Sequence, residues 1–460
     1  MSDLPDGWAI AALGEMVVNR DNQRVPVNAK ERSTRQGTVP YYGAAGQVGW
    51  IDTALYVEQL LLLGEDGVQF FDPGKSKAYI IDGPSWVNNH AHVLSRIASG
   101  PSLPYLKYFL DQFDYRGYAN GTTRLKLTRS AMDTIPVRLA PLAGQERLVS
   151  AVDEAFSKLD AGEAGLRTTR QLLKRMREAV LAAAVTGRLV PQDPTDIPAA
   201  KLLADLGVEP LNDPSLPVLP AAWSWTQVQE VGQVDLGRQR SPKYHSGDNM
   251  KPYLRVANVF EDRIDTSDVM EMHFEPEAFE RSRLFVGDIL LNEGQTPELL
   301  GRPAMYRGEP PEVAFTNSLL RFRAGPGIEP DWALVVFRHH MHSGRFTRES
   351  RITTNIAHLS AARFKPVEFP VPPIEEQRRI VEELDRLSSV MAACERAVDA
   401  GLARSAAFRR SVLKAAFEGR LVPQDSSDEP ATVLLERIRL ERASSESSSG
   451  GRRRKNVEAL

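Results

Sequence analysis

The sequence predicts an α+β protein: two mixed α/β globular domains joined by two long helices that pack as an antiparallel intramolecular coiled coil, with pseudo-two-fold symmetry. The first observation behind this prediction is a repeat. The segment Gly-Arg-Leu-Val-Pro-Gln-Asp occurs at 187–193 and again at 419–425. The residues before each copy align without a gap at the same offset of 232 (419 − 187), with about two in five identical over roughly fifty. Solenoid repeats run roughly 20–50 residues, so this longer period indicates a duplicated domain pair.

The second observation is an apolar stripe ahead of each repeated segment. Apolar residues recur at spacings of three, four and seven, which is typical of one face of a helix. Pro141 and Pro373 suit the start of each helix, and Gly187 and Gly419 suit its end. About 40 residues at 1.5 Å each give a rod of about 60 Å. Two such rods in one chain can bury their stripes against each other, which predicts the coiled coil. The stripes comprise Leu148, Val152, Phe156, Leu159, Leu166, Leu173, Met176 and Val180, then Val381, Leu384, Leu387, Met391, Val398, Leu402 and Val412.

The third observation is a globular region of mixed character ahead of each helix. Both regions contain short β-like runs broken by Gly and Pro. Both also open alike, with Leu-Pro-Asp-Gly-Trp at 4–8 and Leu-Pro-Ala-Ala-Trp at 219–223. The offset there is 215, so the second region carries 17 extra residues (232 − 215). Two regions that share their boundaries but differ in their internal segments are typical of one fold that binds two different ligands.

These features predict the following domain order: a first globular domain at 1–140, a first long helix at 141–192, a Pro-rich connector at 193–218, a second globular domain at 219–372, a second long helix at 373–425, and a partly disordered C-terminal tail at 426–460.

Composition points to an ordinary globular protein of 460 residues, 42% hydrophobic and 25% charged. No apolar run is long enough to span a bilayer, and the N-terminus has no basic-then-apolar leader, so a cytoplasmic protein without membrane attachment is expected. The single Cys394 excludes an internal disulfide and any multi-cysteine zinc site. No glycine-rich cofactor loop, nucleophile motif or metal-ligand spacing stands out. We therefore expect neither a catalytic residue nor a metal in this chain.

The net charge of −3 does not by itself predict a nucleic-acid partner, but basic residues gather in two groups in each half. For any single group a solvated charged surface is the simpler interpretation. Two comparable groups in each half favour contacts with phosphate. The groups are Arg20, Arg24, Lys30, Arg32 and Arg35; Arg116, Arg124, Lys126 and Arg129; Arg238, Arg240, Lys243, Lys251 and Arg255; and Arg338, Arg345, Arg348 and Arg351.

The order of these features resembles the specificity (S) subunit of type I restriction–modification systems. Pro40-Tyr41-Tyr42-Gly43-Ala44, the run Leu62 to Gly67, and Trp86 to His92 resemble elements of that family's target-recognition domains. In the second half, Tyr253 to Val259 and Gly287 to Asn292 do the same, and Pro372 to Val381 resembles the family's helix start. The first copy departs there, since 140–145 has one proline and lacks the acidic pair.

The resemblance implies a non-catalytic subunit with two target-recognition domains, each reading one half of a split sequence in double-stranded DNA across a fixed gap. The paired helices would hold these domains apart and offer surfaces to two methylation subunits. S-adenosylmethionine is expected on those subunits, with no cofactor in this chain. Restriction subunits that translocate DNA can join the assembly, for adenine methylation or cleavage.

Several side chains are candidates for DNA contact. Tyr41 and Tyr42 could present rings and hydroxyls, or one of them could belong to the core. Asn88 and Asn89 have amides that can address adenine, or they cap a strand end. The remaining candidates form backbone-contact loops and basic groups: Thr122, Thr123, Arg124 and Lys126; Arg238, Arg240, Lys243, Tyr244, Arg255 and Asn258; and Arg348, Arg351, Thr353, Thr354 and Asn355.

Two alternatives to this reading remain. The chain could serve a methylation-only system, or it could be a two-lobed DNA-binding regulator, although no short helix-turn-helix or ligand domain is apparent. A stand-alone enzyme is disfavoured by the missing catalytic motifs. The sequence does not fix the target bases, the gap, or the role of the basic segment Arg452 to Lys455.

Overall fold

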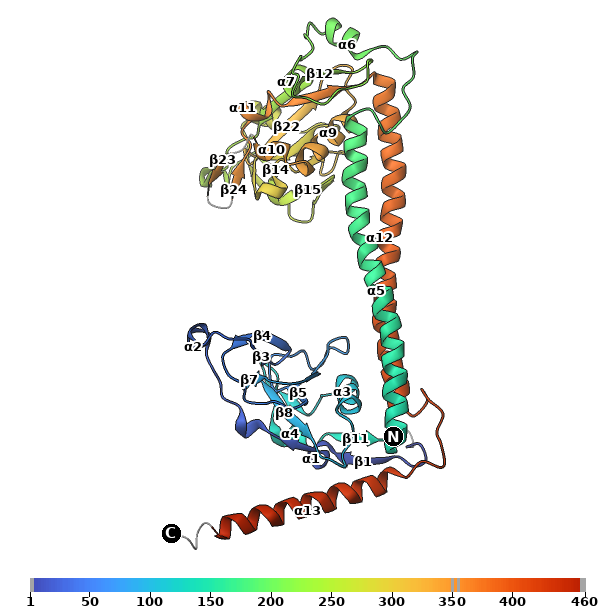
Figure 1. The fold of residues 1–460 in the computed structure, drawn as a ribbon. Helices are drawn as coiled ribbons and strands as arrows, with labels where there is room; N and C mark the ends of the chain where they lie inside the picture. The colour runs from blue at the N-terminus through green and yellow to red at the C-terminus, as the bar shows by residue number, and fades with distance from the viewer. Residues whose placement is uncertain (1–3, 349–350, 354–355, 456–460) are drawn as a thin grey trace. The chain divides into compact units, whose positions relative to one another are not determined.

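The computed structural model describes the backbone of residues 4–348, 351–353 and 356–455, and their side chains apart from those of 351–353 and 445–455. The chain forms two compact units. Unit 1 comprises Met1–Arg167 and Asp399–Leu460, and unit 2 comprises Thr168–Val398. Each unit therefore combines one globular domain with parts of both long helices (Figure 1).

The two long helices are α5, Leu142–Val185, and α12, Ile374–Phe417, each of 44 residues. Each begins directly after the proline that was expected to precede it. Each ends two residues before its glycine, so the repeated Gly-Arg-Leu-Val-Pro-Gln-Asp segment lies outside the helix. Gly187 and Gly419 adopt φ values of +68° and +71°. The next amides bond back to Ala183 and Ala415, which closes the same Schellman-type cap at both ends.

The helices run antiparallel, as predicted. In unit 1, Arg409 of α12 lies 2.5 Å from Asp160 of α5, and the Ser405 hydroxyl donates to Glu163 at 2.7 Å. Seven of the fifteen residues of the expected stripe are buried, for example Leu148 and Met391 at 2% and 3% exposed, and seven more are partly buried. Met176 was wrongly assigned to it, since its side chain is 50% exposed. At Gly401 a side chain would collide with Leu166 at 2.9 Å, so this glycine permits a close helix approach.

The globular domain of unit 1 is built from two small sheets and two short strand pairs. Their strands are β2, β8, β5 and β6 (Val17–Asn19, Ala91–Arg96, Leu60–Gly64, Ala78–Ile81); β4, β3 and β7 (Gly46–Ile51, Val39–Gly43, Trp86–Val87); β1 with β11 (Ala9–Ala12, Pro136–Leu139); and β9 with β10 (Ala119–Asn120, Lys126–Leu127). Its helices are α1, α2, α3 and α4 (Leu13–Met16, Ala29–Thr34, Leu103–Gln112, Arg129–Asp133).

The inner strand β5 separates two of the hydrophobic cores of this domain. Side chains alternate between the faces of a strand. Leu61 and Leu63 join the large core that includes α3 and both long helices, whereas Leu60 and Leu62 join a smaller core with Tyr56. All four leucines are fully buried. The apolar run at this position is therefore a strand covered on both faces.

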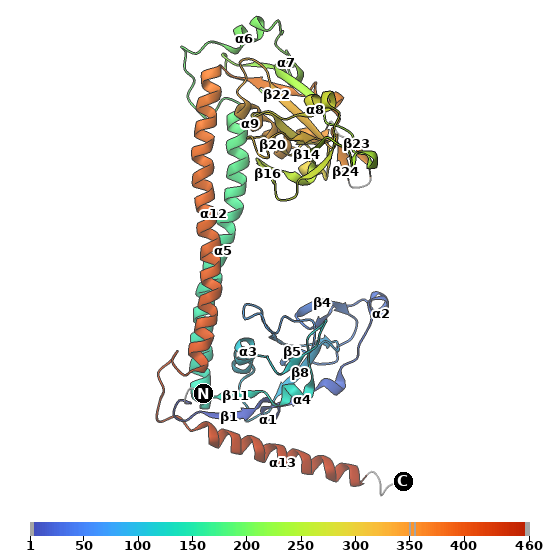
Figure 2. The ribbon, with the colours of Figure 1, turned by 180° about the vertical axis from the view of Figure 1, so that it is seen from behind.

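Unit 2, seen from behind in Figure 2, repeats the four-stranded sheet, the three-stranded sheet and the first strand pair of unit 1 in the same order. Its strands are β13, β22, β18 and β20 (Gly232–Leu236, Leu319–Ala324, Ile289–Asn292, Pro303–Met305); β17, β14 and β21 (Met270–His273, Met250–Leu254, Ala314–Phe315); β12 with β25 (Ser224–Gln227, Glu368–Val371); and β19, β24 and β23 (Gly294–Gln295, Ile356–His358, Arg351–Thr353). Its shorter helices are α6, α7, α8, α9, α10 and α11 (Ala199–Asp205, Val228–Val231, Pro276–Ser282, Pro330–His342, Arg345–Arg348, Ala361–Phe364). The extra length of this region includes the hairpin β15–β16 (Val259–Phe260, Arg263–Ile264) and helix α8.

Each unit is closed by a segment from the other half of the sequence. In unit 1, Arg147 at the start of α5 forms an ion pair with Asp428, which follows the second heptapeptide. In unit 2, Arg379 at the start of α12 pairs with Asp196, which follows the first heptapeptide, at 2.5 Å. Arg147 and Arg379 are related by the offset of 232, and so are Asp196 and Asp428. The repeated sequence therefore forms the same ion pair in both units.

The indole of the tryptophan near the start of each domain adds to this closure. In unit 1, Trp8 Nε1 donates to Gln424 at 2.9 Å. In unit 2, Trp223 Nε1 donates to Glu376 at 2.9 Å, and Gln192 donates to the same carboxylate. The counterpart of Glu376 in the first copy is Gly144 (376 − 232), which has no side chain to accept this bond. In unit 1 the side chain of Gln424 accepts from the tryptophan instead. The missing acidic pair of the first copy is compensated in this way.

The C-terminal segment differs from the expectation of a partly disordered tail. Residues Ala431–Lys455 form helix α13, and Ala431, Leu434, Leu435 and Ile438 are buried in the core of unit 1. The Ala431 amide donates to Gly7 O at 2.8 Å, just as the Ala199 amide of α6 donates to Ala222 O at 2.9 Å in unit 2. The first turns of α13 are therefore the second copy of α6. Residues 456–460 lie outside the described residues.

Candidate nucleic-acid interface

Three loops meet at one edge of the globular domain in each unit, and we refer to each as the recognition edge. In unit 1 it comprises residues 65–66, 88–90 and 120–126, and in unit 2 residues 293–295, 316–318, 351–353 and 356–358. The Glu65 amide donates to His90 O at 2.8 Å, and the Leu127 amide donates to Glu65 O at 2.8 Å. In unit 2, Glu293 bonds to Ser318 O at 3.0 Å and Leu359 to Glu293 O at 2.8 Å. The same backbone bonds hold both edges together.

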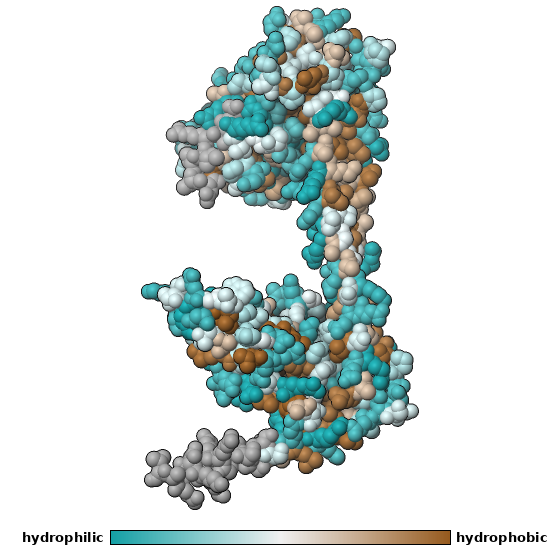
Figure 3. Space-filling model, in the orientation of Figure 1, coloured by the Kyte–Doolittle hydropathy of each residue, from teal (hydrophilic) through white to brown (hydrophobic). Residues whose placement is uncertain are grey.

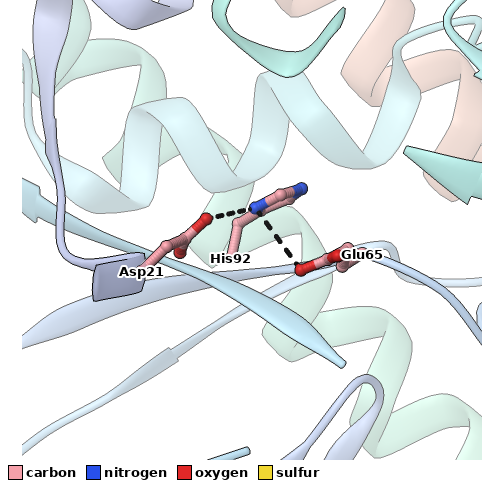
Figure 4. A group of neighbouring side chains, drawn as sticks. All are labelled: Asp21, Glu65 and His92. Carbon is pink, nitrogen blue, oxygen red and sulfur yellow. Dashed lines mark hydrogen bonds and ion pairs between the residues drawn. The ribbon is translucent and has the colours of Figure 1, made fainter. Parts of the chain in front are cut away.

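A buried ionic network supports the edge of unit 1 (Figure 4). His92 Nδ1 lies 2.6 Å from Asp21 and 3.9 Å from Glu65, while its Nε2 lies 2.9 Å from Leu127 O. Arg24 pairs with Glu65 at 2.6 Å and with Asp21 at 3.4 Å. The three residues Asp21, Glu65 and His92 are close enough to hold a metal ion. Because Arg24 and Lys126 together supply two positive charges beside the two carboxylates, the arrangement is satisfied as an ion-pair network.

The pKa values of the two carboxyls reflect this network. Burial acts to raise the pKa of Asp21, but the hydrogen bond with His92 and the amide of Val93 outweigh it and hold that pKa below its usual value. Burial likewise acts on Glu65, whose pKa is lowered by hydrogen bonds from Arg24 and Lys126. Both groups are therefore ionised near neutral pH, and they hold the base of the loops through buried contacts.

The two predicted backbone-contact cations of unit 1 are anchored to this base. Lys126 Nζ lies 3.0 Å from Glu65, and Arg124 lies 2.7 Å from Asp66, which also pairs with His90 at 2.8 Å. The side chains of Lys126 and Arg124 nevertheless remain exposed, at 54% and 58% respectively. They can reach phosphate from a fixed position. Thr122 and Thr123, at the tip of the same hairpin, are exposed.

A basic group beside the recognition edge of unit 2 carries its cations on aromatic rings. The Arg238 guanidinium stacks on Tyr244 at 4.1 Å and Lys243 lies 4.8 Å from the same ring. Arg240 lies 5.7 Å from the ring of Tyr253. Hydrogen bonds from Arg238 and Lys243 lower the pKa of the Tyr244 hydroxyl. The backbone of Arg238 also forms an isolated parallel β-bridge with Thr316 in the recognition edge, so this basic group adjoins the edge.

The predicted side chains fall into four groups by exposure. Asn89, Thr122, Thr123, Arg124, Lys126, Arg240, Lys243 and Arg348 are exposed; Tyr42, Asn88, Arg238, Tyr244 and Arg255 are partly exposed; Tyr41 and Asn258 are buried; and Arg351 and Thr353 are described only as backbone in β23, while Thr354 and Asn355 lie outside the described residues.

Two of these predictions are corrected by burial. Tyr41 is 1% exposed, and its hydroxyl donates to Val27 O at 3.1 Å, so it belongs to the core. Asn258 is 2% exposed and donates to the carbonyls of Asp265 and Asp268, so it shapes a turn. Arg255 pairs with Asp268 at 2.5 Å beside that turn. A strand residue and a turn residue of these types look alike in a sequence whether they face solvent or the interior.

Two further differences concern position. Arg348 borders a crevice with Trp225 and the connector residues Asp213 and Pro217. Conversely, the edge of unit 2 includes Asn317 and His358, which sequence reasoning missed. Asn317 belongs to the segment Phe315 to Ser318, which the strand pairing aligns with Val87 to His90. In this alignment Asn317 is the counterpart of Asn89.

Comparison with known proteins agrees with this architecture. Residues 5–166 match the family model described as the type I restriction modification DNA specificity domain. The specificity subunit of the type I restriction enzyme EcoBI from Escherichia coli is 28% identical over 353 residues, covering 71% of this chain and 68% of the relative. The EcoDI specificity subunit from Escherichia coli is 23% identical over 480 residues, covering 98% and 99%.

The fold has a solved counterpart. A chain from a structure concerned with complex assembly and conformational transition of the type I R-M system aligns with a TM-score of 0.59 at 16% identity, covering 91% of this chain and 99% of that one. Two mixed domains joined to a pair of long helices are thus a fold that this chain shares with a solved chain of a type I R-M system. Residues 5–166 match the type I restriction modification DNA specificity domain, and the chain as a whole is similar to specificity subunits of type I restriction–modification systems. Among its described residues, no helix is long and apolar enough to cross a membrane.

Proposed function

We propose that this chain reads a bipartite sequence in double-stranded DNA, one half with each recognition edge, and positions methylation and restriction subunits for adenine methylation or cleavage. One observation carries the proposal: the same strand order and the same edge-closing hydrogen bonds occur twice, with different side chains on each edge. A shared frame presents each edge to a duplex in the same pose, and its own side chains select its half-site.

The length of the long helices would set the distance between the two half-sites. Each is continuous through both units, and 44 residues at 1.5 Å per residue make a helix of about 66 Å. A turn of duplex is about 34–36 Å, so such a helix is long enough to set half-site centres more than one turn apart. A helix of fixed length gives a fixed number of unread base pairs.

The helix pair also offers apolar surface to partner subunits. In unit 2, Leu172, Met176 and Val390 are 55%, 50% and 51% exposed, and in unit 1 Phe408 is 55% exposed. Figure 3 shows apolar residues gathered along the helix pair of unit 2. Exposed apolar residues on a helix pair are typical of interaction surfaces. One such surface in each unit fits two methylation subunits. The setting of this complex would be the cytoplasm.

The test is single-molecule methylation mapping of DNA from cells that express this chain together with its methylation subunits, and of cells that express the subunits alone. We expect a new split motif with methylated adenine in both halves and one fixed gap. Replacing residues 1–140 by the equivalent region of a relative should change one half-site and leave the other and the gap unchanged. A motif that is continuous, or that changes in both halves on this replacement, would contradict the division of labour.

A further inference from the structure

The recognition edges contain one turn that is equivalent in both units by sheet register. In unit 1 it connects β7 to β8, and in unit 2 it connects β21 to β22. Strand β8 pairs with β5 through Ala91 and Gly64, and β22 pairs with β18 through Leu319 and Asn292. The strand before each turn pairs in parallel with β3 or β14. Residues 88–90 and 316–318 are therefore matched one by one, independently of any sequence alignment.

The first residue of each turn is used to hold the turn. The Asn88 amide donates to Tyr42 O at 3.0 Å, and its Oδ1 accepts from the His90 amide at 2.9 Å. In unit 2, the Thr316 amide donates to Leu254 O at 3.1 Å, and its hydroxyl lies 3.0 Å from the hydroxyl of Ser318. Different side chains thus perform the same local task. Asn88 is a capping residue, in line with the second of its two sequence interpretations.

The second residue of each turn is asparagine in both units. Asn89 is exposed and Asn317 is partly exposed. Within the described part of the chain, neither side-chain amide has a hydrogen-bond partner. The backbone of Asn317 is held, because its amide donates to Arg238 O at 3.0 Å. Each side-chain amide thus has unused donors and an unused acceptor on a backbone that its neighbours fix, so that only the side chain has to be ordered on binding.

The surroundings of both asparagines fit a DNA duplex. Arg124 and Lys126 belong to the edge of Asn89, and the basic group of Arg238 and Lys243 adjoins that of Asn317. Such cations position a protein on phosphates, whereas an asparagine amide can donate to adenine N7 and accept from adenine N6 in the major groove. We propose that Asn89 and Asn317 are paired base-reading residues, each specifying an adenine in its own half-site. This inference rests on the proposed function.

The experiment uses the full chain in complex with its methylation subunits and a randomised duplex library, from which bound sequences are selected. For Asn89→Ala we expect lost preference at one adenine of a single half-site, and for Asn317→Ala the same in the other half-site. Discrimination at that position should fall roughly 5- to 150-fold. Asn212→Ala, an exposed amide of the connector, is the matched control and should leave the motif unchanged.

A second measurement identifies the contacted atom. In the selected duplex, the adenine is replaced by 7-deazaadenine, which lacks the N7 acceptor. Binding by the wild-type complex should weaken, whereas binding by the matching alanine variant should not change. If the wild type selects a split motif that both alanine variants retain, the asparagine assignment is wrong while the proposed function stands. Relaxation at a base other than adenine would also overturn the assignment. A wild type that selects no split motif would overturn both.

Discussion

Gly187 and Gly419 provide a direct test of how each unit is closed. Both adopt the left-handed conformation at the end of a long helix, and a side chain at either would meet a proline ring. At Gly187 the added carbon would lie 2.3 Å from Pro220 Cγ, and at Gly419 it would lie 2.3 Å from Pro5 Cγ. An alanine therefore forces both an unfavourable backbone conformation and a displacement of the adjoining domain start.

The two costs can be separated. The left-handed conformation costs alanine about 1–2 kcal/mol, and pushing a rigid ring aside adds about 1–3 kcal/mol. We expect Gly187→Ala to lower the free energy of unfolding of unit 2 by about 2–5 kcal/mol. Gly207 has a φ of +70° and nothing within 4 Å of the added carbon. Gly207→Ala, in the same unit, should thus cost only the first part.

Native-state hydrogen exchange followed by mass spectrometry gives the free energy for each unit separately. Gly187→Ala should speed exchange in the core strands of unit 2 and Gly419→Ala in those of unit 1. For the latter, Gly83 is the matched control, because its φ is +76° and its added carbon also meets nothing. Equal losses for Gly187→Ala and Gly207→Ala would refute the role of the proline contact. Equal losses in both units would refute the assignment of one glycine to each unit.

Three further predictions follow from particular contacts. Ile438→Ala should destabilise unit 1 by roughly 2–4 kcal/mol in the same exchange assay, because the side chain is fully buried, whereas Leu440→Ala, 71% exposed, should cost under about 0.5 kcal/mol. Hydrogen bonding and charge from His342 and Arg338 outweigh burial and hold the pKa of Glu261 at about 2. The ionised Glu261 therefore contributes up to about 3 kcal/mol to the free energy of unfolding of unit 2 above its unfolded pKa of 4.5, and this contribution is lost as the pH falls towards 2. In Glu261→Gln, the free energy of unfolding of unit 2 should therefore depend less on pH over this range. Lys243→Gln should reduce the slope of log affinity for DNA against log salt by about 1, and an unchanged slope would show that this lysine meets no phosphate.

The fold could be predicted from the sequence because its long elements carry strong periodic signals. The helix starts follow Pro141 and Pro373, and the ends precede Gly187 and Gly419, where only glycine tolerates the left-handed cap beside a proline ring. The tail shows the limit of composition as a guide. Its Ser/Gly-rich stretch suggests disorder, yet the spacing of Leu434, Leu435 and Ile438 already repeats that of α6. The offset of 232 could have found that helix.

The candidate site was harder to predict than the fold. Burial of Tyr41 depends on which face of β3 meets the core, and a shift of one residue in register reverses it. The pairing of Arg124 and Lys126 with Asp66 and Glu65 joins residues about 60 positions apart in sequence, which no local pattern reveals. Asn317 becomes visible only through strand pairing, because the second domain differs in length from the first.

The closure of each unit by the opposite half has a consequence for inheritance. Because Arg147 meets Asp428 and Arg379 meets Asp196, the two junctions are chemically interchangeable. A genetic crossover between the two heptapeptide copies would remove 232 residues and leave a chain of 228 (460 − 232). That shorter chain keeps Arg147 and Asp428, α5 and α13, but lacks the antiparallel partner that α12 supplies. Two copies could pack their α5 helices against each other, and on the proposed function the product would read the same half-site twice. A change of specificity from split to palindromic would then need one recombination event, together with new packing between the two α5 helices.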